Sequence, residues 1–140
     1  MGCPSDRRDG LIHVVGLPSS GTRLASRLID ACPDLDARHD PTHGTDTPTG
    51  DVVIVVRDER ARRQSELARW PDGFPDRLTF GQLARRFYPT VIVSYESIVA
   101  NPDDVIANLA VVFDVEPWEF TEPVYDANAE AGSRCGPYME

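Results

Sequence analysis

The stretch VVGLPSSGTRL, from Val14 to Leu24, combines glycines and hydroxyl side chains in a pattern that suits an anion. It follows a short apolar run and leads into residues with helical spacing. Where a strand turns into a helix, backbone N–H groups point at a ligand and the helix dipole favours negative charge. Gly16 and Gly21 are spaced as in the phosphate loop GxxxxGK[ST], but Thr22 replaces its lysine. The loop therefore predicts a phosphate site unlike that of an ordinary triphosphate hydrolase, although a plain strand-to-helix turn has a similar composition.

A second group of residues suited to phosphate lies in VVIVVRDERARRQS. Arg57 follows the β-branched run Val52–Val56, and Ser65 comes eight positions later, about two turns into a predicted helix. The carboxyl ends of parallel strands are where α/β folds bind ligands. Arginine holds a phosphate through two N–H groups at once, and a hydroxyl adds a further hydrogen bond. The alternative is a surface ion pair between Arg57 and Asp58 or Glu59.

Composition limits the classes of partner. The chain has 140 residues, 41% of them hydrophobic and 26% charged, and a net charge of −9. This acidic balance argues against sequence-independent binding of nucleic acid. Four arginines nevertheless lie within seven residues, namely Arg57, Arg60, Arg62 and Arg63. Such a local positive patch suits a small anionic ligand better than a polymer.

Length and patterning predict one domain over residues 1–140, with a flexible N-terminus (1–10) and an irregular C-terminal tail (118–140). No apolar run approaches the roughly 20 residues that cross a bilayer, and no signal-peptide pattern is present, which predicts a cytoplasmic protein without membrane contact. The three cysteines lack metal-ligand spacing, so no metal site is expected. The oligomeric state stays open, a homo-oligomer included.

Strand and helix signals alternate along the chain. Short apolar or β-branched runs predict strands over residues 11–15, 35–39, 52–56 and 91–95. Helical spacing predicts helices over residues 22–32, 59–69, 78–87 and 102–113. Asn101 is expected to cap the last of these helices, with Pro102 at its first position. The alternation predicts an α/β fold with a mainly parallel sheet flanked by helices.

Taken in order, these segments resemble the motifs of the PAPS-dependent sulfotransferase family, where PAPS is 3′-phosphoadenosine 5′-phosphosulfate. PSSGT (18–22) is similar to the family's PKSGT loop, and RDERARRQS (57–65) to its RDP followed by a serine eight residues after the arginine. The stretch YESIVANPDD (95–104) looks like its YEDLVADP segment, and RHDP (38–41) resembles its HLP-type segment. The resemblance covers roughly residues 11–117 and implies a three-layer P-loop-like fold.

The resemblance also implies which residues would hold the cofactor. The 5′-phosphosulfate would contact the loop and the first turn of the following helix, which together comprise Ser19, Ser20, Gly21, Thr22 and Arg23. Arg57 and Ser65 would recognise the 3′-phosphate, with Arg134 of AGSRCG as a further contact. Tyr95 would lie near the adenine, and packing in the core is its alternative role.

The reaction implied by the resemblance is sulfuryl transfer from PAPS to a hydroxyl or amine acceptor, which leaves PAP. His39 would act as the general base toward the acceptor, with His43 as the alternative. Arg23 would help to stabilise the charge on the leaving phosphate. The acceptor itself is not indicated.

The chain departs from the family pattern at a position that matters for this reaction. Ser19 stands where the family has the lysine that stabilises the leaving oxygen, so Arg23 would have to supply the charge. Most of the insertions that build an acceptor pocket are also missing. Two alternatives therefore stay beside the enzyme: a non-catalytic module that binds PAPS or PAP, and a small kinase-like P-loop protein.

Overall fold

The computed structural model describes residues 11–39, 51–73 and 79–124. Four strands alternate with helices along this part of the chain, as the sequence predicts. The strands are β1 (Leu11–Gly16), β2 (Asp36–His39), β3 (Asp51–Val56) and β4 (Val91–Ser94). The helices are α2 (Thr22–Asp30), α3 (Glu59–Arg69), α4 (Phe80–Phe87), α5 (Tyr95–Ala100) and α6 (Pro102–Phe113).

The four strands form one parallel sheet in the order β2-β1-β3-β4. Val14 of β1 is in register with His39 of β2 on one side and with Val53 of β3 on the other. After β1 the chain thus forms β2 at one edge of the sheet, and it later forms β3 on the opposite side of β1. The carboxyl ends of β1 and β3 flank this switch in direction, which is where open α/β sheets bind ligands.

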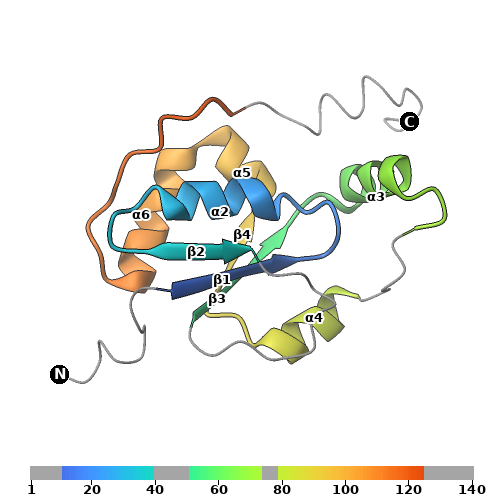
Figure 1. The fold of residues 1–140 in the computed structure, drawn as a ribbon, viewed down its shortest axis with the longest axis horizontal. Helices are drawn as coiled ribbons and strands as arrows, with labels where there is room; N and C mark the ends of the chain where they lie inside the picture. The colour runs from blue at the N-terminus through green and yellow to red at the C-terminus, as the bar shows by residue number, and fades with distance from the viewer. Residues whose placement is uncertain (1–10, 40–50, 74–78, 125–140) are drawn as a thin grey trace.

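Both faces of the sheet are covered, because successive side chains of each strand point to opposite faces. Val53 and Val55 of β3 belong to a core shared with α2, α5 and α6, whereas Val52 and Ile54 pack with α4. Figure 1 shows the two layers on either side of the sheet, and α3 lying beyond the end toward which the strands point. This confirms the predicted three-layer α/β fold with a parallel sheet.

The fourth strand is shorter than predicted. Residues 91–95 are apolar enough to extend through Tyr95, but β4 ends at Ser94 and Tyr95 begins α5. The reason is local: the Ser94 side chain accepts a hydrogen bond from the Ser97 N–H at 3.2 Å, and Glu96 lies in the first turn. The predicted cap of α6 is confirmed, with Asn101 accepting from the Asp104 N–H at 3.3 Å.

After α6 the chain has neither helix nor strand over residues 115–124, yet it is fastened to α2. The Trp118 indole N–H donates to the Leu28 carbonyl oxygen at 2.8 Å, and Arg27 pairs with Glu122 at 3.0 Å. The predicted flexible segment 1–10 and residues 125–140 of the predicted tail lie outside the described residues. Among the helices of the part described, none is long and apolar enough to cross a membrane.

Candidate anion-binding site

The turn between β1 and α2 is closed by hydrogen bonds of its own. The Ser20 N–H and hydroxyl both donate to the Leu17 carbonyl oxygen, at 3.1 and 2.6 Å. Ser19 and Gly21 have positive φ angles of 65° and 93°. Gly21 is the N-cap of α2, and no side chain of the described residues caps this helix. The first N–H groups of a helix have no intrahelical acceptor, so this end of α2 is available to an anion.

Gly21 is required by both its backbone and its surroundings. Its φ angle lies in the region that side chains rarely adopt, and an added Cβ would stand 2.5 Å from Cδ1 of Tyr95. Gly16 is equally confined, since a Cβ there would lie 2.9 Å from both the Thr22 side chain and the Val55 carbonyl oxygen. The loop therefore packs directly against the end of β3 and the start of α5.

Arg57 connects the loop to the carboxyl ends of β3 and β4. Its Nη1 donates to the Ser19 carbonyl oxygen at 2.9 Å, and its guanidinium lies 5.0 Å from the centre of the Tyr95 ring. The two residues next to Arg57 have structural roles in α3: Asp58 caps the helix by accepting from the Ala61 N–H at 3.0 Å, and Glu59 pairs with Arg62. Arg57 is thus placed at the switch point by its contacts with the loop and the ring.

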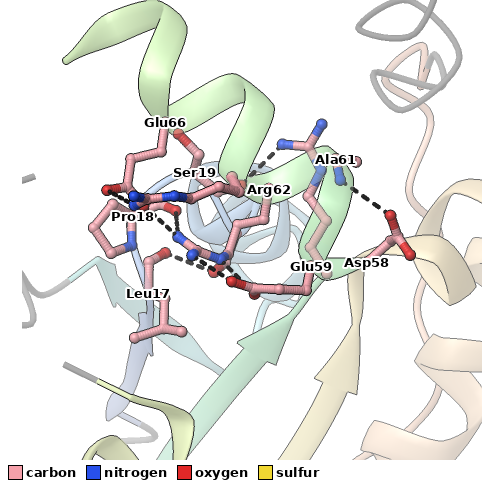
Figure 2. A network of polar contacts seen from close by, with 11 residues as sticks. Leu17, Pro18, Ser19, Asp58, Glu59, Ala61, Arg62 and Glu66 are labelled. Carbon is pink, nitrogen blue, oxygen red and sulfur yellow. Dashed lines mark hydrogen bonds and ion pairs between the residues drawn. The ribbon is translucent and has the colours of Figure 1, made fainter. Parts of the chain in front are cut away.

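A second arginine contacts the loop from α3. Arg62 Nη1 donates to the Pro18 carbonyl oxygen at 2.8 Å and to Glu66 at 2.7 Å, while Nε and Nη2 bind the two oxygens of Glu59 at 2.8 and 2.7 Å. Arg63 also pairs with Glu66, at 3.0 Å. Figure 2 shows this network between α3 and the loop. The arginine cluster is therefore less positive than its sequence indicates, because two members are neutralised by glutamates.

The sequence pattern does not single out Arg62 or Glu66 as residues of the site. The available signal is the spacing of Glu59, Arg62 and Glu66, which places opposite charges three and four positions apart on one helix face. The contact with Pro18 depends on tertiary structure and has no sequence signal.

The charges of this network hold one another in their ionised forms. Hydrogen bonds from Arg62 lower the pKa of Glu59, against the opposing effect of partial burial. The same bonds raise the pKa of Arg62, which stays a cation although its side chain is only 8% exposed. Nearby, Glu96 accepts hydrogen bonds from the Asp58 N–H at 2.8 Å and the Ser94 hydroxyl at 3.2 Å. The start of α3 is thus surrounded by carboxylates, unlike the start of α2.

The predicted loop residues lie together, but their hydroxyls differ in what they offer. Ser19 Oγ is covered from solvent and has no hydrogen-bond partner among the described residues. Ser20 is 2% exposed and donates its hydroxyl proton to Leu17. Thr22 is half-buried and Arg23 is exposed in the first turn of α2. Backbone N–H groups, Thr22 and Arg23 are therefore the groups best placed to meet a ligand at the end of α2.

The other predicted site residues are placed less uniformly. Tyr95 is 5% exposed and belongs to the core beneath the loop, which favours packing as its role. Ser65 is half-buried in the second turn of α3, and no contact described here joins it to Arg57. His39 is exposed at the carboxyl end of β2, at the edge of the sheet. His43 and Arg134 lie outside the described residues.

Comparison with known proteins identifies the fold. No family model matches the chain, and neither does any curated protein sequence. Among solved structures, the crystal structure of mouse sulfotransferase SULT7A1 complexed with PAP is similar, with a TM-score of 0.51 and 15% sequence identity. The match covers 96% of this chain and 67% of that one. The chain has a sulfotransferase-like fold. At this identity the likeness concerns the architecture, which is consistent with the P-loop-like fold expected from the sequence.

The part of the chain that the structure describes contains no preformed metal site. No group of three or more His, Cys, Asp or Glu side chains there is arranged to hold a metal ion.

Proposed function

We propose that this chain binds PAPS and transfers its sulfuryl group to a hydroxyl or amine acceptor, releasing PAP. The observation that carries the proposal is the uncapped N-terminus of α2, which lies at the switch point of the sheet beside Arg57. The likeness in fold to a sulfotransferase solved with PAP supports the same class of ligand. The approximate preservation of the family's motif order along the chain supports it independently.

The residues of α2 would bind the 5′ end of the ligand. Their N–H groups, which no described side chain caps, and the helix dipole favour a dianionic phosphosulfate, with the Thr22 hydroxyl and Arg23 adding a hydrogen bond and a charge. Arg57 lies beside the loop, where one of its N–H groups binds the Ser19 carbonyl oxygen. Together with Ser65 it would recognise the 3′-phosphate, and this distinguishes PAPS from ATP.

The transfer is an in-line displacement at sulfur. A bond forms between sulfur and the acceptor oxygen or nitrogen, while the bond from sulfur to the 5′-phosphate oxygen breaks and its electron pair stays on PAP. The acceptor proton would pass to His39, or to His43 as the alternative, and an imidazole suits this step near neutral pH. The N–H groups of α2 and Arg23 would stabilise the charge that develops on the leaving oxygen.

A second candidate function is the binding of PAPS or PAP without catalysis. The observation that favours it is Ser19, which takes the place of the lysine expected from the resemblance and whose hydroxyl oxygen is covered from solvent. Arg23 is then the one described cation in the first turn of α2. Whether it can replace that lysine decides between an enzyme and a binding protein.

Isothermal titration calorimetry with PAP and ADP tests the ligand assignment. PAP should bind at least about tenfold more tightly than ADP, because a charge-assisted contact with the 3′-phosphate contributes about 1.5–3 kcal/mol. Arg57→Ala should remove this preference, whereas Arg85→Ala, the same change at an exposed position of α4, should keep it. Equal affinities of the unaltered protein for PAP and ADP would contradict the assignment.

Catalysis is tested with labelled PAPS and a panel of hydroxyl and amine acceptors. The enzyme should transfer label to at least one acceptor, and His39→Ala should lower turnover by about 100-fold or more if this imidazole is the base. Full turnover by that variant would move the role to His43. PAP binding with no transfer to any acceptor would favour the binding protein.

A further inference from the structure

We propose that Arg62 is a positioning residue, which holds the loop 17–21 in the shape that presents the start of α2 to an anion without touching the ligand itself. The inference rests on the proposed function, since it concerns the same site. The inference goes beyond the proposed function because it places a determinant of ligand affinity on α3, at a residue other than the loop residues and the motif residues Arg57 and Ser65.

The first argument is the direction of the loop's peptide groups. Arg62 binds the Pro18 carbonyl oxygen at 2.8 Å, and Arg57 binds the next carbonyl oxygen, that of Ser19, at 2.9 Å. In a trans peptide the C=O and N–H groups point in opposite directions. Two successive carbonyls are therefore turned toward arginines, and the Ser19 N–H is turned away from Arg62.

The second argument is backbone strain at the residue between these two contacts. Ser19 has a φ of 65°, in the left-handed region that disfavours residues with a Cβ. Such a conformation persists only where the surroundings enforce it. The Ser20 hydrogen bonds to the Leu17 carbonyl oxygen close the turn around Ser19, and the two arginines hold the carbonyls on both sides of its α-carbon. Without the Arg62 contact, the loop is expected to sample other conformations.

The third argument separates positioning from ligand binding. Arg62 uses four of its five N–H donors within the protein, three of them on carboxylates, and its side chain is 8% exposed. Glu59 and Glu66 cancel its charge at close range. A group so enclosed and neutralised offers an anion little attraction, so its influence must pass through Pro18.

The test uses a double variant that removes the contact and leaves no buried charge alone. Arg62→Met with Glu66→Met replaces a buried pair, 8% and 6% exposed, by apolar side chains, a change that often preserves stability. In the ligand-free protein, the amide NMR signals of residues 19–22 should shift while those of β3 stay in place. PAP affinity should fall about tenfold, with the same salt dependence as in the unaltered protein. Arg57→Gln, in contrast, should weaken the salt dependence.

Arg63→Met is the matched control. Arg63 pairs with the same Glu66 at 3.0 Å but is 47% exposed and makes no described contact with the loop, so its loss should leave loop signals and PAP affinity unchanged. If the double variant fails to fold, Arg62→Lys provides the same two measurements. A lysine retains the charge next to Glu66 and reaches one acceptor, so both readouts should lie between those of the unaltered protein and complete loss.

The outcomes distinguish this inference from the proposed function. If the unaltered protein binds PAP and the double variant binds it equally well with unshifted loop signals, Arg62 has no positioning role. A parallel change in the Arg63→Met control would also overturn that role, because it would assign the effect to Glu66 or to α3 as a whole. If the unaltered protein does not bind PAP but the amide signals of the loop still shift in the double variant, the positioning role of Arg62 is supported and the ligand assignment is wrong.

Discussion

Helices α2 and α3 begin in equivalent places, each directly after one of the two central strands, yet their first turns are opposite in character. At α3, the Asp58 side chain caps the helix, Glu59 lies in the first turn, and Glu96 accepts the Asp58 N–H. At α2, Gly21 stands at the cap without a side-chain hydrogen bond, and the first turn has no acidic residue. One helix start is satisfied by the protein's own carboxylates, whereas no side chain among the described residues caps the other.

The difference shows how a strongly acidic chain can carry a candidate anion site. The carboxylates near the switch point are held by specific partners: Glu59 and Glu66 pair with arginines of α3, and Glu96 binds the start of the same helix. Because the field of a paired charge falls off quickly, the end of α2 is shielded from much of their repulsion. Net charge alone therefore says little about which ligand the site accepts.

Among the variants that test this comparison, Gly21→Ala should change stability and PAP affinity the most. The new Cβ would stand 2.5 Å from Tyr95 at a φ of 93°, so the loop must move. Backbone strain and overpacking together should lower the free energy of unfolding by about 2 kcal/mol or more. PAP affinity should fall at least about tenfold, because the N–H groups of α2 lose their placement. Urea denaturation and calorimetry measure the two effects.

Gly81→Ala is the control for that prediction. Gly81 lies in α4 with ordinary spacing, since the nearest atom to an added Cβ is 3.7 Å away on the Arg85 side chain. Alanine favours a helix over glycine by up to about 1 kcal/mol, so this variant should be slightly more stable and bind PAP normally. A Gly21→Ala protein with unchanged stability and affinity would show that the loop does not need the described conformation.

An intermediate effect is expected when the cap of α3 is removed. Asp58→Ala leaves the Ala61 N–H without its partner at 3.0 Å and should lower the free energy of unfolding by about 1 kcal/mol. Thr79→Ala removes the equivalent cap of α4 and should cost a similar amount. If the two helix starts have the separate roles described, neither change should weaken PAP binding more than about threefold. A large loss of affinity in Asp58→Ala alone would make the start of α3 part of the ligand site.

The smallest effect is a dependence of stability on pH at Glu59. Hydrogen bonds from Arg62 lower the pKa of this carboxyl below its ordinary value of 4.5. Its ionised form therefore stabilises the fold above about pH 4.5, and this contribution is lost as the pH falls through the lowered pKa. Glu59→Gln should be less stable at pH 7, by no more than about 0.5 kcal/mol because the side chain is 68% exposed. Denaturation at pH 7 and pH 3 should show the difference shrinking; a constant difference contradicts the pairing.

Most of the fold could be predicted from local patterns. The β-branched run of β3, the helical spacing of α2 and α6, and the Asn101–Pro102 start of α6 each determine their own structure. The end of β4 was harder, because Tyr95 fits a strand and only the Ser94 cap marks the start of α5. The strand order agrees with the parallel sheet expected from alternating strands and helices, but it depends on contacts between distant segments.

The site was predictable in part. The glycine spacing and the arginine at the end of β3 locate the loop and Arg57, since both motifs are local. The use of Arg62 to hold Pro18, and of Glu59 and Glu66 to neutralise Arg62, depends on how α3 is oriented toward the loop. No local rule gives that orientation. For the same reason the sequence predicts a positive patch at the arginine cluster, whereas in the structure Arg62 and Arg63 pair with glutamates.

The order of the strands also has a consequence for synthesis of the chain. The loop is made early, but Arg57 lies 38 residues after Ser19, and Arg62 lies 44 residues after Pro18. Parallel pairing of β1 with β3 likewise waits for the segments between them, and contacts so distant along the chain form slowly. Until residues 51–62 have been synthesised, β1 lacks its neighbour β3 and the loop lacks both arginines. Nascent chains that end before Arg62 therefore carry the loop without the contacts that hold the Pro18 and Ser19 carbonyl oxygens.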